Sequence, residues 1–488
     1  MKAARSVLRE PALSSDWEMV VGLEVHVELN TKSKLFCGCA NRFGDEPNTN
    51  VCPVCLGLPG SLPVVNLRAV RLAIRLGRAL GCKINPAVFA RKNYFYPDMP
   101  KNYQISQYRQ AINTGGAVKL PDGSVVELER AHIEEDTGKT IHIGGSGRIK
   151  GAAYSLVDHN RAGVPLIEIV TLPQLYTASQ VRAFVRELRA ILLATGVSDA
   201  RMQEGSMRVD ANVSVRPADN SELRTRCEIK NISSVRSLSR AVVYEANRHI
   251  DLWSTGGSPD QETRHWDEER GCTISGRSKE HTEDYRYFPD PDLAPFIFSK
   301  DDIAAVDAAL PLLPTARREK IIAACGGMIT LETAALLVER DQDELVINAV
   351  SAGADVKRVI TRVVNDLALD DWAVVTPERL AEVVVMETSG RISATQAKKI
   401  LVEMVEHGTD PEAVVAARGF ENVSRGEIVS IVEDIIEKHQ DEWQLYCRGD
   451  ATDRKKMSSF LTGQVMRATK GRADGATVSR LLHQHAQN

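Results

Sequence analysis

Apolar and polar residues alternate strictly in segment 21–29, which reads Val-Gly-Leu-Glu-Val-His-Val-Glu-Leu. Successive side chains of a β-strand point to opposite faces, so this period of two residues predicts a strand. One face of the strand is expected to carry Glu24, His26 and Glu28, and the other face is apolar. The pattern therefore places two carboxylates and an imidazole side by side.

Other segments extend this pattern into a domain of mixed structure. Segments 167–170 and 209–215 also alternate, and we interpret them as strands. Apolar residues instead recur at helical spacing in segments 66–80, 178–195 and 235–251. Together these segments predict the α+β fold class.

The composition changes after this domain. Prolines cluster at 289–314, and the chain beyond is rich in Ala, Leu and Val with helical periods, where Ser393 is placed as a helix N-cap. These changes predict four regions: a flexible N-terminal extension at 1–15, an α+β domain at 16–298, a helical domain at 299–405 and a small helical tail domain at 406–488.

The composition is that of a soluble globular protein. The 488 residues are 43% hydrophobic and 26% charged, with a formal net charge of −4. This balance favours no polyanionic partner, so nucleic-acid binding would depend on local basic patches. No apolar run reaches the roughly 20 residues that a membrane helix needs, and residues 1–15 lack the apolar core of a signal peptide. A cytoplasmic location without membrane contact is expected, with a short cleaved transit segment as the alternative.

Four of the nine cysteines lie in a short frame, Cys37-Gly-Cys39 followed by Cys52-Pro-Val-Cys55. Two thiolates on one turn fix half of a tetrahedron, so CxC and CxxC pairs can together close a zinc site. All four positions are filled by sulfur, which predicts a structural zinc and not a hydrolytic one. The alternative is a group of reduced, buried cysteines without metal.

Carboxylates cluster in segments 24–28, 132–136 and 261–268. Oxygen ligands on strands are typical of Mg²⁺, which is usually held by one or two carboxylates with phosphates and waters. The alternative for each cluster is a solvated charged face. The chain has neither a Walker A phosphate loop nor a Gly-x-Ser-x-Gly nucleophile elbow, so a nucleotide would need a sheet site with metal.

Segment 91–107 interleaves basic, aromatic and amide residues with two prolines. Rigid aromatic surface beside Lys and Arg suits a nucleotide base and its phosphates. A β-hairpin with aromatic packing is the alternative interpretation.

Nine segments together resemble the B subunit of the aspartyl/glutamyl-tRNA(Asn/Gln) amidotransferases. The resemblance covers the chain from about Trp17 to the C-terminus, and the combination is far more specific than any single segment. The segments are VGLEVHVEL (21–29), RKNYFYPDMPKNYQISQ (91–107), HIEEDTGK (132–139), SLVDHNRAGVPLIEIV (155–170), GSMRVDANVSVRP (205–217), EIKNISS (228–234), QETRHWDE (261–268), DYRYFPDPDL (284–293) and GQVMRATKG (463–471).

The resemblance implies a fold and an activity. The fold is a large antiparallel-sheet catalytic cradle, similar to glutamine synthetase and guanidino kinases, followed by an all-α domain and a small helical tail that binds tRNA. The family forms a heterotrimer that adds an amidase subunit, which supplies ammonia, and a small linker subunit. It uses ATP and Mg²⁺ to phosphorylate the side-chain carboxylate of Glu-tRNA(Gln) or Asp-tRNA(Asn), and the ammonia then displaces phosphate.

The resemblance also implies site residues. Glu24, His26 and Glu135 match the family's catalytic Mg²⁺-binding residues, with Glu268 as the first choice for a further ligand and Glu262 as the second. The four cysteines of the CxC and CxxC pairs match the zinc-bearing branch of the family. Contacts with ATP are expected from Lys92, Tyr94, Lys101 and Arg161.

Two details of the sequence remain open within this resemblance. Glu134 adjoins Glu135, and the sequence does not separate the two. The tail has Arg-Ala-Asp-Gly at 472–475 where family tails often read Gly-x-Ala-Asn-Pro. A basic patch suited to phosphate is still expected from Lys455, Lys456, Arg467, Lys470 and Arg472, with a solvated helix face as the alternative.

Two other functions compete with this interpretation. The first is a zinc-stapled tRNA-binding scaffold without catalysis. The second is a free-standing carboxylate–amine ligase, which is weakened because no residue set for glutamine hydrolysis is visible. The sequence does not decide which misacylated tRNA is served.

Overall fold

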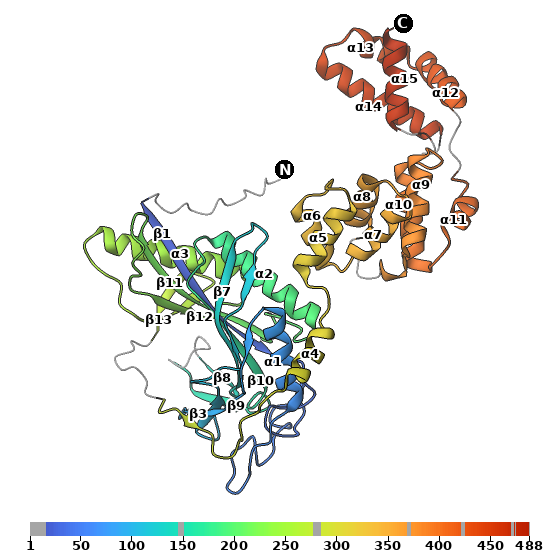
Figure 1. The fold of residues 1–488 in the computed structure, drawn as a ribbon. Coiled ribbons are helices and arrows are strands. Elements are labelled where there is room, and N and C mark those ends of the chain that lie inside the picture. The colour runs from blue at the N-terminus through green and yellow to red at the C-terminus, as the bar shows by residue number, and fades with distance from the viewer. Residues whose placement is uncertain are drawn as a thin grey trace. The chain divides into compact units, whose positions relative to one another are not determined.

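The computed structural model describes most of the chain (Figure 1). The described residues are 16–144, 151–276, 285–367, 372–420, 425–469, 473 and 475–487. The predicted extension at 1–15, together with Lys470 and Arg472 of the predicted basic patch, lies outside them. The chain divides into two compact units, Met1–Thr315 and Ala316–Asn488.

A sheet of ten strands forms the centre of the first unit. The strand order is β14-β13-β12-β11-β1-β10-β7-β5-β2, and β6 pairs with β7. The bounds are β1 Trp17–Glu28, β2 Lys83–Ile84, β5 Asn113–Thr114, β6 Ala117–Lys119, β7 Val125–Glu135, β10 Pro165–Thr171, β11 Met207–Pro217, β12 Cys227–Lys230, β13 Thr263–Asp267 and β14 Cys272–Ser275. Two small sheets accompany it, β15-β3-β4 (Phe288–Pro289, Ala90–Asn93, Tyr103–Ser106) and β8-β9 (Lys139–Ile143, Tyr154–Asp158).

The large sheet is mixed, which corrects the predicted antiparallel sheet at one strand pair. β12 and β13 run parallel, whereas the other pairs are antiparallel. A parallel pair needs a crossover connection, and helix α3 (Val235–Ser254) lies between these two strands in the sequence. The α+β fold class is otherwise confirmed, and the likeness to glutamine synthetase stays a prediction.

Helices α1 (Leu67–Ala79), α2 (Ala178–Thr195) and α3 cover one face of this sheet. They begin where side chains of Asn66, Thr177 and Ser234 accept hydrogen bonds from backbone N–H groups of the first turn. The apolar residues of β1 pack with their apolar faces in one continuous hydrophobic core. The opposite face of the sheet is thereby left for polar side chains.

Helix α4 (Lys300–Ala308) belongs to the first unit, beyond the boundary predicted at residue 298. It packs against α1, where Arg78 Nε lies 2.6 Å from Asp307 Oδ1 and Arg75 donates to the carbonyl of Ala309. These contacts explain why the first unit extends to Thr315.

The second unit is helical in its described residues, and its buried apolar residues form two separate clusters. One cluster involves α5 Pro314–Ala324, α6 Leu331–Glu339, α7 Asp343–Ser351, α8 Val356–Asp366, the 3₁₀ turn η1 Trp372–Val374, α9 Pro377–Thr388, α10 Ala394–His407 and α11 Pro411–Arg418. The other involves α12 Arg425–Lys438, α13 Gln440–Arg448, α14 Ala451–Ala468 and α15 Gly475–Gln487. Ser393 caps α10 as predicted. None of the helices in the described ranges is both long and apolar enough to cross a membrane.

We predict that Phe184→Ala destabilises the first unit by about 3–5 kcal/mol, because Phe184 is fully buried between α2 and the sheet and its removal leaves a cavity. Urea denaturation of the two proteins measures the difference. Leu193→Ala on the same helix is the control, since its side chain is 42% exposed. A loss for Leu193→Ala as large as that for Phe184→Ala would contradict the proposed core.

Candidate active site

The polar face of the large sheet collects charged side chains from neighbouring strands. Glu24, His26 and Glu28 lie on one face of β1, while the intervening Val25 and Val27 are fully buried on the other. The alternation predicted for segment 21–29 is therefore confirmed. We call this polar side of the sheet the acid face.

Strand pairing adds residues to the acid face from both sides of β1. Glu168 of β10 is the register partner of His26, and His132 of β7 is in turn the partner of Glu168. On the other side, Arg208 and Asp210 of β11 pair with His26 and Glu24. Paired residues share a face, so the side chains converge although their positions are far apart in the sequence.

His26 lies between two carboxylates. Its Nε2 is 3.6 Å from Glu168 Oε2 and 3.8 Å from Glu134 Oε1. His132 Nε2 is 3.3 Å from the same oxygen of Glu168. Potential ligand atoms of His26, Glu134 and Glu168 all lie within 4.8 Å of one another.

The acid face shifts the pKa values of its members. Burial lowers the pKa of His26, but hydrogen bonding to Glu168 and the charges of Glu168 and Glu134 outweigh this effect and raise it to about 9. Burial raises the pKa of Glu168, whereas hydrogen bonds from His132 and His26 bring it well below its ordinary value. Burial raises the pKa of Glu24, with the charge of Glu168 acting in the same direction.

Glu28, at the C-terminal end of β1, also has a raised pKa. Burial raises the pKa of Glu28 to about 7, and the charge of Asp136 adds to this effect. Arg208 and Arg161 oppose the rise, and both contact Asp136 Oδ2, at 3.0 and 3.4 Å. The predicted residue Arg161 therefore lies near the acid face, where it also donates to the carbonyls of 137 and 138.

The donor set of the acid face suits a divalent cation. Oxygens from carboxylates with one imidazole are ligands that Mg²⁺ and similar cations accept. A cation would also offset the mutual repulsion of the carboxylates that raises their pKa. Glu24, His26, Glu134 and Glu168 are thus the residues that would hold the ion, with Glu24 bonded to Asn212 at 2.8 Å.

The structure does not place Glu135 with the other predicted cation ligands. Glu135 follows Glu134 on β7 and points to the opposite face, where it forms an ion pair with Lys101 and accepts from the N–H of Ile105 at 2.8 Å. Glu134, and not Glu135, therefore lies beside His26, because adjacent residues of a strand point to opposite faces. The assignment of Glu135 as a cation ligand stays a prediction.

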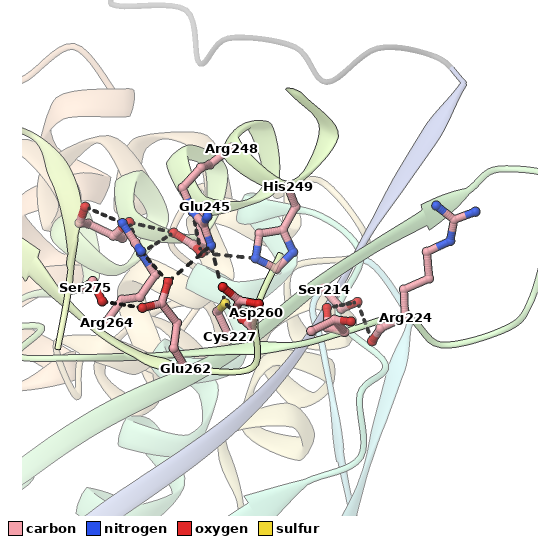
Figure 2. A network of polar contacts seen from close by, with 12 residues as sticks. Ser214, Arg224, Cys227, Glu245, Arg248, His249, Asp260, Glu262, Arg264 and Ser275 are labelled. Atoms are coloured by element: carbon pink, nitrogen blue, oxygen red, sulfur yellow. Dashed lines mark hydrogen bonds and ion pairs between the residues drawn. The ribbon is translucent and has the colours of Figure 1, made fainter. Parts of the chain in front are cut away.

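Glu262 and Glu268 also lie outside the group around His26. Glu268 is half-exposed and contacts Arg240 at 2.7 Å and the indole N–H of Trp266 at 2.6 Å. Glu262 contacts Arg264 and the hydroxyl of Ser275 (Figure 2). Both carboxylates have protein partners, and neither belongs to the group of potential ligand atoms around His26; their assignment as cation ligands stays a prediction.

Figure 2 shows a second buried polar network, centred on Glu245 of α3. Cys227, Glu245 and His249 have potential ligand atoms within 4.8 Å of one another. The Arg248 guanidinium already lies 2.6 Å from Glu245 Oε1 and 3.4 Å from Cys227 Sγ, and Arg264 is 3.4 Å from Glu245 Oε2. These cations balance the carboxylate, so we interpret the network as a structural connection between α3 and β12–β14.

The predicted nucleotide segment forms part of the small sheet β15-β3-β4. Lys92 Nζ lies 4.5 Å from the ring centre of Tyr285, and Tyr94 packs on Tyr96 with ring centres 4.7 Å apart. The charge of Lys92 lowers the pKa of Glu134, although burial and Glu168 leave it raised overall. Lys92 is therefore near the acid face, whereas Lys101 contacts Glu135 on the other side of β7.

The four cysteines of the CxC and CxxC pairs, which we call the cysteine cluster, come together as the spacing predicts. Their sulfur atoms all lie within 4.8 Å of one another. Zinc with Zn–S bonds of about 2.3 Å needs sulfurs about 3.8 Å apart, so the cluster fits a tetrahedral metal site. Lys34 Nζ lies 3.7 Å from Cys55 Sγ and donates to the carbonyl of His159 at 3.0 Å.

Sequence reasoning missed Glu168 and His132 as members of the site. Glu168 is the only charged residue in the strand Pro-Leu-Ile-Glu-Ile-Val-Thr, which is otherwise largely buried. A lone carboxylate in an apolar strand was the available signal. Its partner could be found only once β10 was known to pair with β1.

The chain is similar in sequence to known proteins along almost its whole length. The sequence model of the GatB/GatE catalytic domain matches residues 19–304, and that of the GatB domain matches residues 346–485. A Symbiobacterium thermophilum protein is 42% identical over 96% of this chain and 98% of its own length. A Nocardia farcinica protein is 46% identical over 96% and 95%, respectively. Both are named as B subunits of aspartyl/glutamyl-tRNA(Asn/Gln) amidotransferase.

We predict that the purified protein contains about one equivalent of zinc, because four thiolates complete a tetrahedral site. Cys52→Ser should lose the metal, as measured by elemental analysis. Cys272→Ser is the control, since Cys272 lies outside the cluster and should leave the zinc content unchanged. A fully folded wild type without metal would contradict this assignment.

Proposed function

Because the chain belongs to the family of aspartyl/glutamyl-tRNA(Asn/Gln) amidotransferase B subunits, we propose that it activates the side-chain carboxylate of an amino acid esterified to tRNA. The substrates would be Glu-tRNA(Gln) or Asp-tRNA(Asn). The observation that carries this proposal is the acid face, which gathers carboxylates and His26 from three strands in a chain of this family.

The proposed chemistry has two balanced steps. A carboxylate oxygen of the substrate takes the γ-phosphoryl group of ATP, which forms an acyl phosphate and releases ADP. Ammonia then attacks the acyl carbon, phosphate leaves, and the product is the amide of the tRNA-bound amino acid. Such a reaction depends on positioning and charge neutralisation more than on a protein nucleophile.

The acid face would bind Mg²⁺ for the first step. Mg²⁺ would neutralise negative charge on the phosphates of ATP. Glu24 and His26 remain as predicted ligands, and we propose Glu134 in place of Glu135, with Glu168 added. His26 would be oriented by Glu168, its register partner on β10.

Basic residues around the acid face would bind the nucleotide. We propose that Lys92 contacts phosphate and that Tyr94 contributes to the base site, because Lys92 lies on β3 near Glu134 and Tyr94 directly follows this strand. Arg161 lies near Glu28 and can also reach phosphate. Lys101 lies on the other side of β7, where it pairs with Glu135. We keep it as a proposed nucleotide contact because it belongs to the segment 91–107.

Ammonia would come from another protein of the same complex. The sequence shows no residue set for glutamine hydrolysis, and the relatives are named as subunits of a larger enzyme. We propose a cytoplasmic heterotrimer whose other members are an amidase subunit, which releases ammonia from glutamine, and a small linker subunit. In this assembly the cysteine cluster would hold a structural zinc.

The helical tail would bind the tRNA. Lys455, Lys456 and Arg467 are exposed on α14. Lys456 and Arg467 are eleven residues apart, which corresponds to about three helical turns, so they lie on the same side of the helix. Such a row of cations suits contacts with a phosphate backbone, which position tRNA without reading its sequence.

The acid face predicts different outcomes for two adjacent substitutions on β7. Glu134→Gln should reduce ATP-dependent amidation of Glu-tRNA by about 100-fold or more, because it removes charge from the proposed cation site. Glu135→Gln should instead lower the unfolding temperature, because it leaves Lys101 buried without its ion-pair partner. Amide formation, ADP release and thermal unfolding of the reconstituted enzyme measure these effects, with glutaminase activity preserved in both variants.

Glu18→Gln provides the control, since Glu18 lies at the opposite end of β1 and pairs with Arg216. If Glu135→Gln lost amidation and Glu134→Gln did not, Glu135 would be the cation ligand, as the sequence suggests. If the wild-type enzyme bound tRNA tightly but formed no ADP with Glu-tRNA present, a non-catalytic scaffold would replace the proposed function.

A further inference from the structure

Residues 51–67 contain no charged side chain, although 26% of the chain is charged. The segment includes the second half of the cysteine cluster and ends at the start of α1. We call its part after Cys55, residues 56–67, the apolar loop. Because solvent-exposed loops are usually polar, this stretch needs a structural or functional reason.

Four aliphatic side chains of the apolar loop stay largely exposed, although Val65 packs against the core. Leu58 is 49% exposed, and the exposed fractions of Leu62, Val64 and Leu67 are 62%, 73% and 52%. Soluble monomers rarely gather so many exposed aliphatic side chains within ten residues, and such sets mark interaction sites. An interface core is depleted of charge, which matches the composition of this loop.

The loop is held in a defined conformation. Val64 and Asn66 donate backbone hydrogen bonds to the carbonyls of Phe36 and Leu35, and Ser61 bonds back to Leu58. Gly57 has a φ of +66°, and a Cβ at this position would lie 2.9 Å from the Cα of Lys101. A rigid apolar surface loses little entropy on binding, which favours a stable contact.

The β8–β9 ribbon presents a second apolar surface near the cysteine cluster. Ile141 and Leu156 are register partners, and with Tyr154 they are 43%, 54% and 58% exposed. A two-stranded sheet is only marginally stable alone unless something packs on its apolar face. Asn48, from the segment between the two cysteine pairs, bonds to Asp158 and to the carbonyl of Val157 at the end of β9.

The apolar loop also borders the region of the proposed reaction. Leu58 and Pro63 line a cavity together with Lys101 and Tyr103. Lys101 pairs with Glu135 on the other side of β7, and Glu135 directly follows Glu134 of the acid face at the end of this strand. A protein that covers the loop would therefore lie near the end of β7 that carries Glu134.

We propose that the apolar loop and the apolar face of the β8–β9 ribbon form the docking surface for the glutamine-hydrolysing subunit. This inference rests on the proposed function, which requires a partner that supplies ammonia next to the acid face. The absence of charge in the loop favours a permanent protein partner, because its burial leaves no charge to be desolvated. The cysteine cluster adjoins the loop at Cys55, and Asn48, between the two cysteine pairs, bonds to the end of the ribbon.

The experiment separates docking from catalysis. Leu62→Glu and Val64→Glu place a charge in the centre of the proposed interface and should each lower, by about tenfold or more, the affinity for the amidase subunit. Amidation with glutamine as the nitrogen source should fall accordingly, whereas amidation with added ammonium chloride should persist. Zinc content and circular dichroism establish that the variants are folded.

Leu223→Glu is the matched control, since Leu223 is 56% exposed but lies in the segment before β12, away from the loop in sequence. Wild-type binding by Leu62→Glu and Val64→Glu, or equal weakening by Leu223→Glu, would overturn the docking surface. A homodimer of the isolated chain that is lost in Leu62→Glu would assign the surface to a second copy instead. Failure of the wild type to use ammonium chloride would count against the proposed function and not against the docking surface.

Discussion

The structure of the first unit depends on one constraint, the concentration of carboxylates on a sheet face whose other side is largely apolar. Helices α1, α2 and α3 bury the apolar side of β1, so a shift of one residue would move Glu24 and His26 into the hydrophobic core. The register is thus fixed by the same alternation that assembles the polar site. On the acid face, burial and the charge of Glu168 raise the pKa of Glu24 and of Glu134, and the charge of His26 opposes the rise at Glu134.

Local patterns predicted the elements but not all of their partners. The alternation in segment 21–29, the helices at 178–195 and 235–251 and the N-cap at Ser393 follow from nearest-neighbour chemistry, and the structure contains all of them. The parallel pairing of β12 and β13 was not predictable in this way. It depends on the path of the chain through α3, which no local period records.

In the candidate site, too, residues on one strand could be predicted together, whereas residues joined by strand pairing could not. Glu24 and His26 belong to one short strand, so their shared face could be read directly from the sequence. The choice between Glu134 and Glu135 required the register of β7 against β10, because adjacent residues of a strand point to opposite sides. Glu268 was expected as a ligand from the family resemblance, and the sequence could not show that its carboxylate contacts Arg240 and Trp266.

The central position of β1 also has a consequence for biosynthesis. The strand ends at Glu28, but its two partners in the sheet begin at Pro165 and Met207. At typical rates of translation, the ribosome needs on the order of ten seconds to reach even the first of them. During this interval the nascent chain displays an unpaired, half-apolar strand. Such a strand is a natural target for chaperones that bind extended segments, and for aggregation where those chaperones are scarce.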